Sequence, residues 1–197
     1  MADRGRLGRP RSARGDGYSL IELMVAVSLI TIVGGFAAAR VLAPVDHSRG
    51  HAAARYLAGR LGLARVMAVS RGTAVALRFD QEPRGITFTV FQDGNGNGIR
   101  SADITAGIDA LIDGATALSD QFPGVEIGLI PGSPGTEAVQ LGRTNLLTFT
   151  PLGTATSGTI YISDRVGTQW AVRVMGATGR TRVLRYDLPT HGWLVAE

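Results

Sequence analysis

The loop at residues 91–103, FQDGNGNGIRSAD, holds a concentrated set of oxygen-bearing side chains. Four of its residues match positions 1, 3, 5 and 6 of an EF-hand-type calcium loop: Asp93, Asn95, Asn97 and Gly98. The twelfth position, where such a loop carries a bidentate acid, is occupied by Ile104, and Asp103 comes one residue early. The alternative is a Gly/Asn turn after a strand, in which the side chains make local hydrogen bonds. Two hypotheses therefore stay open, a calcium site that uses Asp93, Asn95, Asn97 and Asp103, or a turn without metal.

No arrangement of residues predicts a catalytic site. Six acids between residues 103 and 145 are spaced irregularly, and we interpret them as solvated loop acids: Asp103, Asp109, Asp113, Asp120, Glu126 and Glu137. The three histidines are too few and too scattered for a histidine-centred site, and the chain has no cysteine for a thiol nucleophile or a thiolate zinc site. No GxSxG, Walker A or HExxH pattern is present. The sequence therefore predicts a protein that is not an enzyme and, apart from the calcium ion left open above, has no cofactor.

The N-terminal segment combines positive charge with a long apolar run. All twenty cations of the chain are arginines, and five lie before residue 18 against two acids, so that segment carries +3 and the rest of the chain only +1. Residues 20–39 are almost all apolar or small, and as a helix they would span about 30 Å, the thickness of a bilayer's hydrocarbon core. The positive flank predicts a cytoplasmic N-terminus and export of the remainder. A secretory signal cleaved at residues 36–39 is the minor alternative.

The sequence GYSLIELMVAVSLI at residues 17–30 closely resembles the type IV prepilin signal, commonly written GFTLIELMVVIAIL. The resemblance implies that a prepilin peptidase cleaves between Gly17 and Tyr18 and methylates Tyr18. It also makes Glu22 the fifth mature residue, where pilin-like proteins hold an acid that pairs with the N-terminal amine of a neighbouring subunit during assembly. From its spacing alone, Ser19-x-x-Glu22 fits a capping box at a helix start, a role compatible with assembly.

The segment after the apolar run has the periodicity of an amphipathic helix. Four apolar residues follow the spacing i, i+4, i+7, i+11 of one buried face: Leu57, Leu61, Ala64 and Ala68. Three arginines lie off that stripe and are interpreted as a solvated face: Arg55, Arg60 and Arg65. Gly72 is a plausible stop, and Pro44 with residues 46–50 predicts a kink or an interruption between the membrane and globular halves.

Beyond Gly72 the pattern changes to short β-rich runs. They lie at residues 73–79, 86–92, 146–150, 159–163 and 169–175. A turn containing Pro83 and Gly85 joins the first two as a hairpin, and no helical pattern separates the runs. With 45% hydrophobic and 18% charged residues the chain is too apolar for disorder, so we expect an antiparallel, sandwich-like domain.

The globular half resembles the GspH/FimT minor pseudopilins. Their helix-end signature is matched by Ala64, Arg65, Ala68, Arg71, Gly72, Val75 and Leu77. A later segment of that family is matched by Phe149, Pro151, Gly153, Gly158, Thr159 and Ile160. The resemblance implies an α+β, pilin-like fold, in which a long N-terminal helix, half transmembrane and half amphipathic, packs on two antiparallel sheets. It also implies a structural subunit of a type II secretion pseudopilus, with prepilin peptidase, the inner membrane, and the major and other minor pseudopilins as partners.

These inferences divide the chain into four parts. We expect a basic leader peptide at residues 1–17, a transmembrane helix at 18–43, an amphipathic helix at 44–72 and a periplasmic β domain at 73–197. The leader would lie in the cytoplasm, and the mature protein would be extracted from the inner membrane into the pseudopilus.

The alternative function is DNA capture through Gly179-Arg180-Thr181-Arg182. Some FimT-type pilins carry a similar Gly-Arg-x-Arg motif that contacts DNA during uptake. In an extended strand Arg180 and Arg182 would point to one face, with Arg173 and Arg185 near them, and such a cluster could clamp phosphates without reading sequence. Against it, the mature chain is close to neutral, and Gly-Arg before a β-rich run also begins an ordinary hairpin in the secretion-type relatives.

Overall fold

The structure is a computed structural model, and the residues that it describes are 19–164 and 167–196, with side chains described outside 34–47. The chain divides into two compact units, Met1–Val41 and Leu42–Glu197. The predicted cleavage site, Gly17 and Tyr18, lies outside the described residues.

Helix α1 (Leu20–Arg71) is 52 residues long and belongs to both units. In its first turn the Leu23 N–H donates to the Ser19 carbonyl at 3.1 Å, which places Ser19 at the start of the helix. The interruption expected at Pro44 is wrong, because the helix is continuous through that residue. A proline inside a helix removes one backbone hydrogen bond, and here the remaining ones keep the helix intact.

In the first unit, the side chains described for residues 20–33 are exposed on every face of α1. The exposed fraction is 77% for Leu20 and 71% for both Ile21 and Ile30. Within the part of the chain that the structure describes, no helix is long and apolar enough to cross a membrane.

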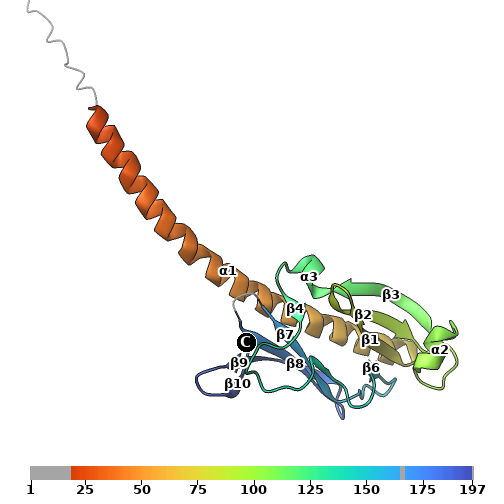
Figure 1. Cartoon of the computed structure of the whole chain (residues 1–197). Helices are drawn as coiled ribbons and strands as arrows, with labels where there is room; N and C mark the ends of the chain where they lie inside the picture. The colour runs from red at the N-terminus through yellow and green to blue at the C-terminus, as the bar shows by residue number, and fades with distance from the viewer. Residues whose placement is uncertain (1–18, 165–166, 197) are drawn as a thin grey trace, which may run out of the picture. The chain divides into compact units, whose positions relative to one another are not determined.

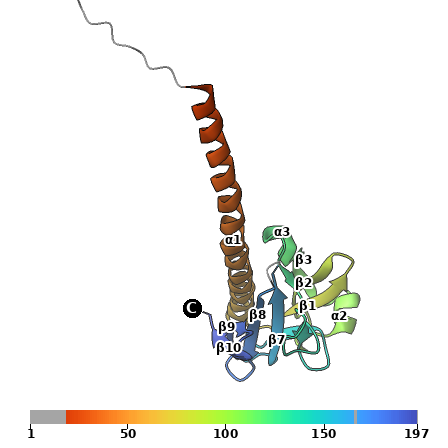
Figure 2. The same cartoon turned by 60° about the vertical axis from the view of Figure 1, so that its left-hand side comes forward.

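The second unit holds two antiparallel sheets (Figures 1 and 2). The first has the strand order β3-β2-β1-β6 and is formed by β1 (Val75–Glu82), β2 (Gly85–Gln92), β3 (Ala110–Ala117) and β6 (Leu146–Phe149). The second has the order β10-β9-β8-β7-β4 and is formed by β4 (Glu126–Ile127), β7 (Gly158–Ser163), β8 (Gln169–Met175), β9 (Arg180–Asp187) and β10 (Gly192–Val195). A further short strand, β5 (Val139–Gln140), also pairs with β7. Two short helices, α2 (Ser101–Thr105) and α3 (Leu118–Gln121), flank β3, so the expectation of no helix among the strands is wrong.

The core lies between the globular half of α1 and both sheets. The predicted helical stripe is buried, with Leu57, Leu61 and Ala68 fully inaccessible and Ala64 2% exposed. The stripe shares one hydrophobic cluster with residues of both sheets, among them Leu77, Phe88, Phe149, Ile160 and Val172. Figures 1 and 2 show this part of α1 running along the strands of both sheets. The predicted α+β class, with a helix packed on two antiparallel sheets, is confirmed.

Candidate functional site

The loop after β2 is closed by hydrogen bonds to Asp93, a residue only 6% exposed. Its Oδ1 accepts the backbone N–H groups of Asn95 at 3.1 Å and Gly96 at 2.8 Å, and its Oδ2 accepts that of Gly98 at 2.9 Å. Asn95 Oδ1 accepts the Asn97 N–H at 3.1 Å. Two of the four side chains proposed as calcium ligands, Asp93 and Asn95, therefore bind the backbone of their own loop, as the turn hypothesis predicts.

Asp109 holds the same loop from its other side. It is 3% exposed, and its carboxylate accepts the N–H groups of Gly94 and Arg100, each at 3.2 Å. Its interpretation as a solvated acid is wrong, because the loop folds over it and supplies two donors. Asp103 is partly buried, and in the described chain no group of three or more His, Cys, Asp and Glu side chains could hold a metal ion.

Two other acids from the same irregular set also have structural partners. Asp113 forms an ion pair with Arg60 of α1. Asp120 accepts the Ala117 N–H at 3.4 Å at the start of α3. Asp120 is nevertheless exposed, as expected of a solvated acid, whereas Asp113 is paired because the fold brings Arg60 to it from a distant part of the chain.

Three arginines gather on the outer face of the second sheet. Arg173 of β8 lies between Val172 and Val174, which are buried in the core, so it points to the opposite face. Arg182 of β9 is its direct partner across the strands, and Arg180 lies two residues away on the same face. Arg185 pairs with the core residue Trp170 and so lies on the other face, which corrects the expectation that it joins the cluster.

Arg65 of α1, which the sequence did not single out for this role, lines a groove together with two of them, Arg180 and Arg182. A groove of about 590 Å³ is lined by Gly62, Arg65, Val66, Gly179, Arg180, Thr181 and Arg182. Arg65 Nε donates to the Gly153 carbonyl at 3.2 Å and is therefore not simply solvated. Gly179 has φ +60°, and a Cβ there would collide with the Gly153 carbonyl and lie 2.9 Å from Arg65 Nε. A glycine is therefore needed here for the turn before β9 to approach Gly153 and Arg65 so closely.

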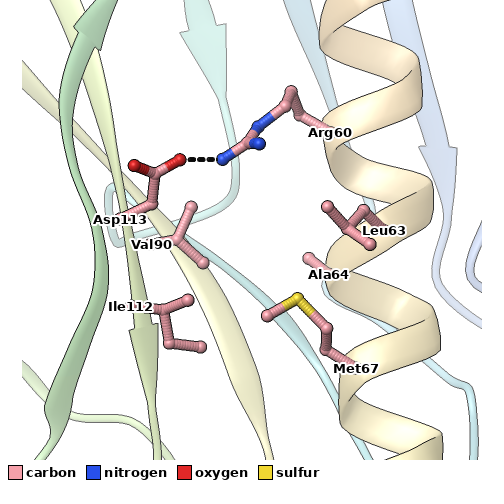
Figure 3. Close-up of a pocket in the computed structure, with 7 residues that line it drawn as sticks. All are labelled: Arg60, Leu63, Ala64, Met67, Val90, Ile112 and Asp113. Carbon is pink, nitrogen blue, oxygen red and sulfur yellow. Dashed lines mark hydrogen bonds and ion pairs between the residues drawn. The ribbon is translucent and has the colours of Figure 1, made fainter.

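A smaller pocket of about 140 Å³ lies between α1 and the strands β2 and β3 (Figure 3). Its apolar lining comes from Leu63, Ala64, Met67, Val90 and Ile112. The ion pair between Arg60 and Asp113 bounds it. Arg60, like Arg65, was expected on a solvated face, and its partner is 53 residues away in the sequence.

Glu22 lies in the first turn of α1, and its side chain is exposed among exposed apolar residues. Glu22 belongs to the first unit, whereas the β2 loop, the arginine groove and the small pocket belong to the second.

The sequence model of the family described as type II transport protein GspH matches residues 53–179. The model of the prokaryotic N-terminal methylation motif matches residues 14–38. No curated protein is significantly similar to the chain. A similar solved structure is that of the minor pseudopilin EpsH from the Type 2 Secretion System of Vibrio cholerae. It is 19% identical with a TM-score of 0.45, and the match covers 70% of this chain and 97% of that chain.

The family match extends from the buried stripe of α1 through both sheets to the turn before β9, which is more than half of the chain. The motif match covers the last residues of the basic leader, the cleavage signal and nearly all of the apolar run. On these two matches, the chain belongs to the type II transport protein GspH family and carries a prokaryotic N-terminal methylation motif.

Proposed function

We propose that the protein is a minor pseudopilin, a structural subunit of a type II secretion pseudopilus, and that it supports protein secretion. The observation that carries the proposal is the presence in one chain of a GspH domain and an N-terminal methylation motif that leads into an apolar helix. GspH pseudopilins are structural and not enzymatic, so the prediction that this chain is not an enzyme is confirmed.

The proposed anchor is the apolar start of α1, residues 20–39. Leu20, Ile21 and Ile30 are each more than two thirds exposed. Apolar surface costs about 25 cal/mol for each Å² left in water, and exposed apolar stretches of this kind mark membrane or protein contacts. Lipid would cover these side chains before assembly, and helices of neighbouring pseudopilins would cover them in the filament. The N-terminus would then lie in the cytoplasm and the β domain in the periplasm.

Processing follows from the same signal. Prepilin peptidase would cut between Gly17 and Tyr18 and methylate the new amine of Tyr18. Glu22, whose carboxylate is exposed within the first turn of α1, would pair with the amine of a neighbouring subunit. A carboxylate in an apolar surrounding is costly unless it finds such a partner.

The test is the mass and sequence of the mature N-terminus, in cells with and without the peptidase. We expect a chain that begins at N-methylated Tyr18 when the peptidase is present and at Met1 when it is absent. A mature chain that begins at Met1 in both strains, or at a residue after Ala39, would exclude the proposal.

A second function, DNA binding, is supported by the arginine groove. Arg173 and Arg182 lie directly opposite each other, an arrangement of like charges that is destabilising unless an anion lies between them. Among the described residues no ion pair neutralises Arg173, Arg180 or Arg182. Backbone phosphates would supply such an anion without requiring a particular base sequence.

A further inference from the structure

The loop that joins β2 to α2 (Figure 1) contains two Asn-Gly pairs in succession, Asn95-Gly96 and Asn97-Gly98. Asparagine is a thermolabile residue, and it deamidates most readily before glycine, which has no side chain to shield its backbone nitrogen. The residues of both pairs are exposed or partly exposed, so water reaches them. The third asparagine of the chain, Asn145, is followed by leucine. The chemistry of deamidation therefore concentrates in this loop.

Deamidation begins when the backbone nitrogen of the next residue attacks the side-chain carbonyl carbon of asparagine. A new C–N bond closes a succinimide ring, the attacking nitrogen gives its proton to hydroxide or water, and the side-chain nitrogen leaves as ammonia. Water then opens the ring at either carbonyl and produces aspartate or isoaspartate. In this loop the attacking atoms are the nitrogens of Gly96 and Gly98. Each must lose its proton and reach its target carbon at a near-attack distance.

One side chain, Asp93, binds both of these attacking nitrogens. Its Oδ1 accepts the Gly96 N–H at 2.8 Å, and its Oδ2 accepts the Gly98 N–H at 2.9 Å. A carboxylate is far too weak a base to remove an amide proton, and its negative charge opposes the loss of that proton to solvent. Because Asp93 is 6% exposed, water does not easily replace it as the acceptor. The folded loop therefore disfavours the first step at both pairs.

The two asparagines differ in how firmly they are held. Asn95 Oδ1 accepts the Asn97 N–H at 3.1 Å, so the side chain of Asn95 is fixed as well as its attacking nitrogen. The side chain of Asn97 is exposed and makes no hydrogen bond to another described residue. Only the bond from Gly98 N–H to Asp93 opposes the reaction there. Asn97 is therefore the first of the two to react when the loop opens.

We propose that Asn97-Gly98 is a deamidation site that the Asp93 carboxylate keeps from reacting in the folded chain. Aspartate at position 97 would add a negative charge close to Asp93, and isoaspartate would lengthen the backbone of the turn. Both products oppose closure of the loop. A loop that stays open would thus be converted into a form that no longer closes, which makes its unfolding irreversible.

The test follows each asparagine by peptide mass spectrometry while the full chain, in detergent micelles, is incubated at mildly alkaline pH. A synthetic peptide of residues 91–103 gives the rate without the fold, and Asn145 is the internal reference for an asparagine that glycine does not follow. We expect Asn97 to deamidate at least about tenfold more slowly in the folded chain than in the peptide, because a hydrogen bond to a charged group must first open.

A matched pair of variants assigns the protection to Asp93. Asp93→Ala removes the acceptor of the attacking nitrogens. Asp109→Ala also removes a buried carboxylate from this loop, but that carboxylate binds the N–H groups of Gly94 and Arg100. We expect Asp93→Ala to raise the deamidation rate of Asn97 at least about tenfold, and Asp109→Ala to raise it less than about threefold. Circular dichroism checks that both variants are folded.

Hydrogen exchange of the unsubstituted chain keeps the test valid if Asp93→Ala does not fold. The Gly98 amide should exchange at least about tenfold more slowly in the folded chain than in the peptide. Equal exchange of that amide, equal deamidation of Asn97 in chain and peptide, or equal effects of the two folded variants would overturn the proposal. Deamidation of Asn95 before Asn97 in Asp93→Ala would overturn the assignment of the site to Asn97.

Discussion

Asp93 shows how one side chain can organise a whole loop. Its carboxylate accepts three backbone N–H groups from residues 95, 96 and 98 while being 6% exposed. Removing a buried acceptor leaves its donors without a hydrogen bond, which lowers the free energy of unfolding by about 1–3 kcal/mol. We therefore expect Asp93→Ala to lower the free energy of unfolding of residues 45–197 by about 2–3 kcal/mol in urea titrations.

The control for that experiment is Glu137→Ala, which removes an exposed acid with no hydrogen bond in the described structure. Its effect should stay within about 0.5 kcal/mol. An equal effect of the two substitutions would exclude the structural role of Asp93. If added calcium raised the free energy of unfolding of the unsubstituted domain, the hypothesis of a calcium site in this loop would be favoured over that of a turn without metal.

Glu22 is the residue on which assembly is proposed to depend. Because its proposed role is to pair with an amine of another subunit, Glu22→Gln should leave peptidase cleavage and membrane insertion intact and strongly reduce incorporation into the filament. Immunoblots of membrane and sheared-filament fractions would measure both steps. Normal incorporation of Glu22→Gln would remove the assembly role.

At the residue scale, sequence reasoning found local contacts and missed distant ones. The Asp93 and Asn95 bonds lie within five residues, so turn chemistry could predict them. Arg65 contacts Gly153 across 88 residues, and Arg60 pairs with Asp113 across 53. No spacing rule connects residues that far apart, and only the packing of α1 on the strands brings them together.

At the scale of elements, α1 offers a comparison of two glycines in one helix. A Cβ at Gly59 would have no atom within 4 Å, whereas a Cβ at Gly50 would lie 2.5 Å from Trp170 Nε1. Gly59→Ala should raise the free energy of unfolding by about 0.5–1 kcal/mol, because alanine loses less backbone entropy on folding. Gly50→Ala should lower it by about 1–3 kcal/mol through overpacking. Thermal unfolding of the two variants shows whether each is more or less stable than the unsubstituted protein. A change in the same direction for both would contradict these two predictions.

The strands could be predicted from the sequence where their residues form an apolar, β-rich run. The five predicted β-rich runs correspond to β1, β2, β6, β7 and β8, with ends shifted by a few residues. The sequence carries no clear strand pattern at β3 and β10, and at β9 it indicates only that Arg180–Arg182 could be extended. β3 is rich in small residues, and β9 alternates arginine with other residues at its start. Edge and solvent-facing strands lack the apolar run on which such predictions rest.

At the scale of the whole molecule, the distribution of arginine decides where DNA could bind if DNA capture, and not only secretion, is a function of the protein. Net charge beyond residue 17 is only +1, so any DNA affinity must come from the local cluster around Arg65, Arg180 and Arg182. A gel shift of residues 45–197 on double-stranded DNA should then show binding that weakens steeply with salt. The Arg180→Gln/Arg182→Gln double variant should abolish it, whereas Arg84→Gln/Arg143→Gln, outside the cluster, should not. No binding at low salt would leave only the secretion function.

The packing of α1 along both sheets has a mechanical consequence. The buried stripe from Ala53 to Ala68 extends over roughly 22 Å of helix, at 1.5 Å per residue. A pull along the helix axis would load all of these contacts in shear at the same moment, because the stripe runs parallel to the force. Contacts loaded together resist rupture far better than contacts that peel apart one after another. Within the second unit, the globular half of α1 and both sheets would therefore move together under such a load.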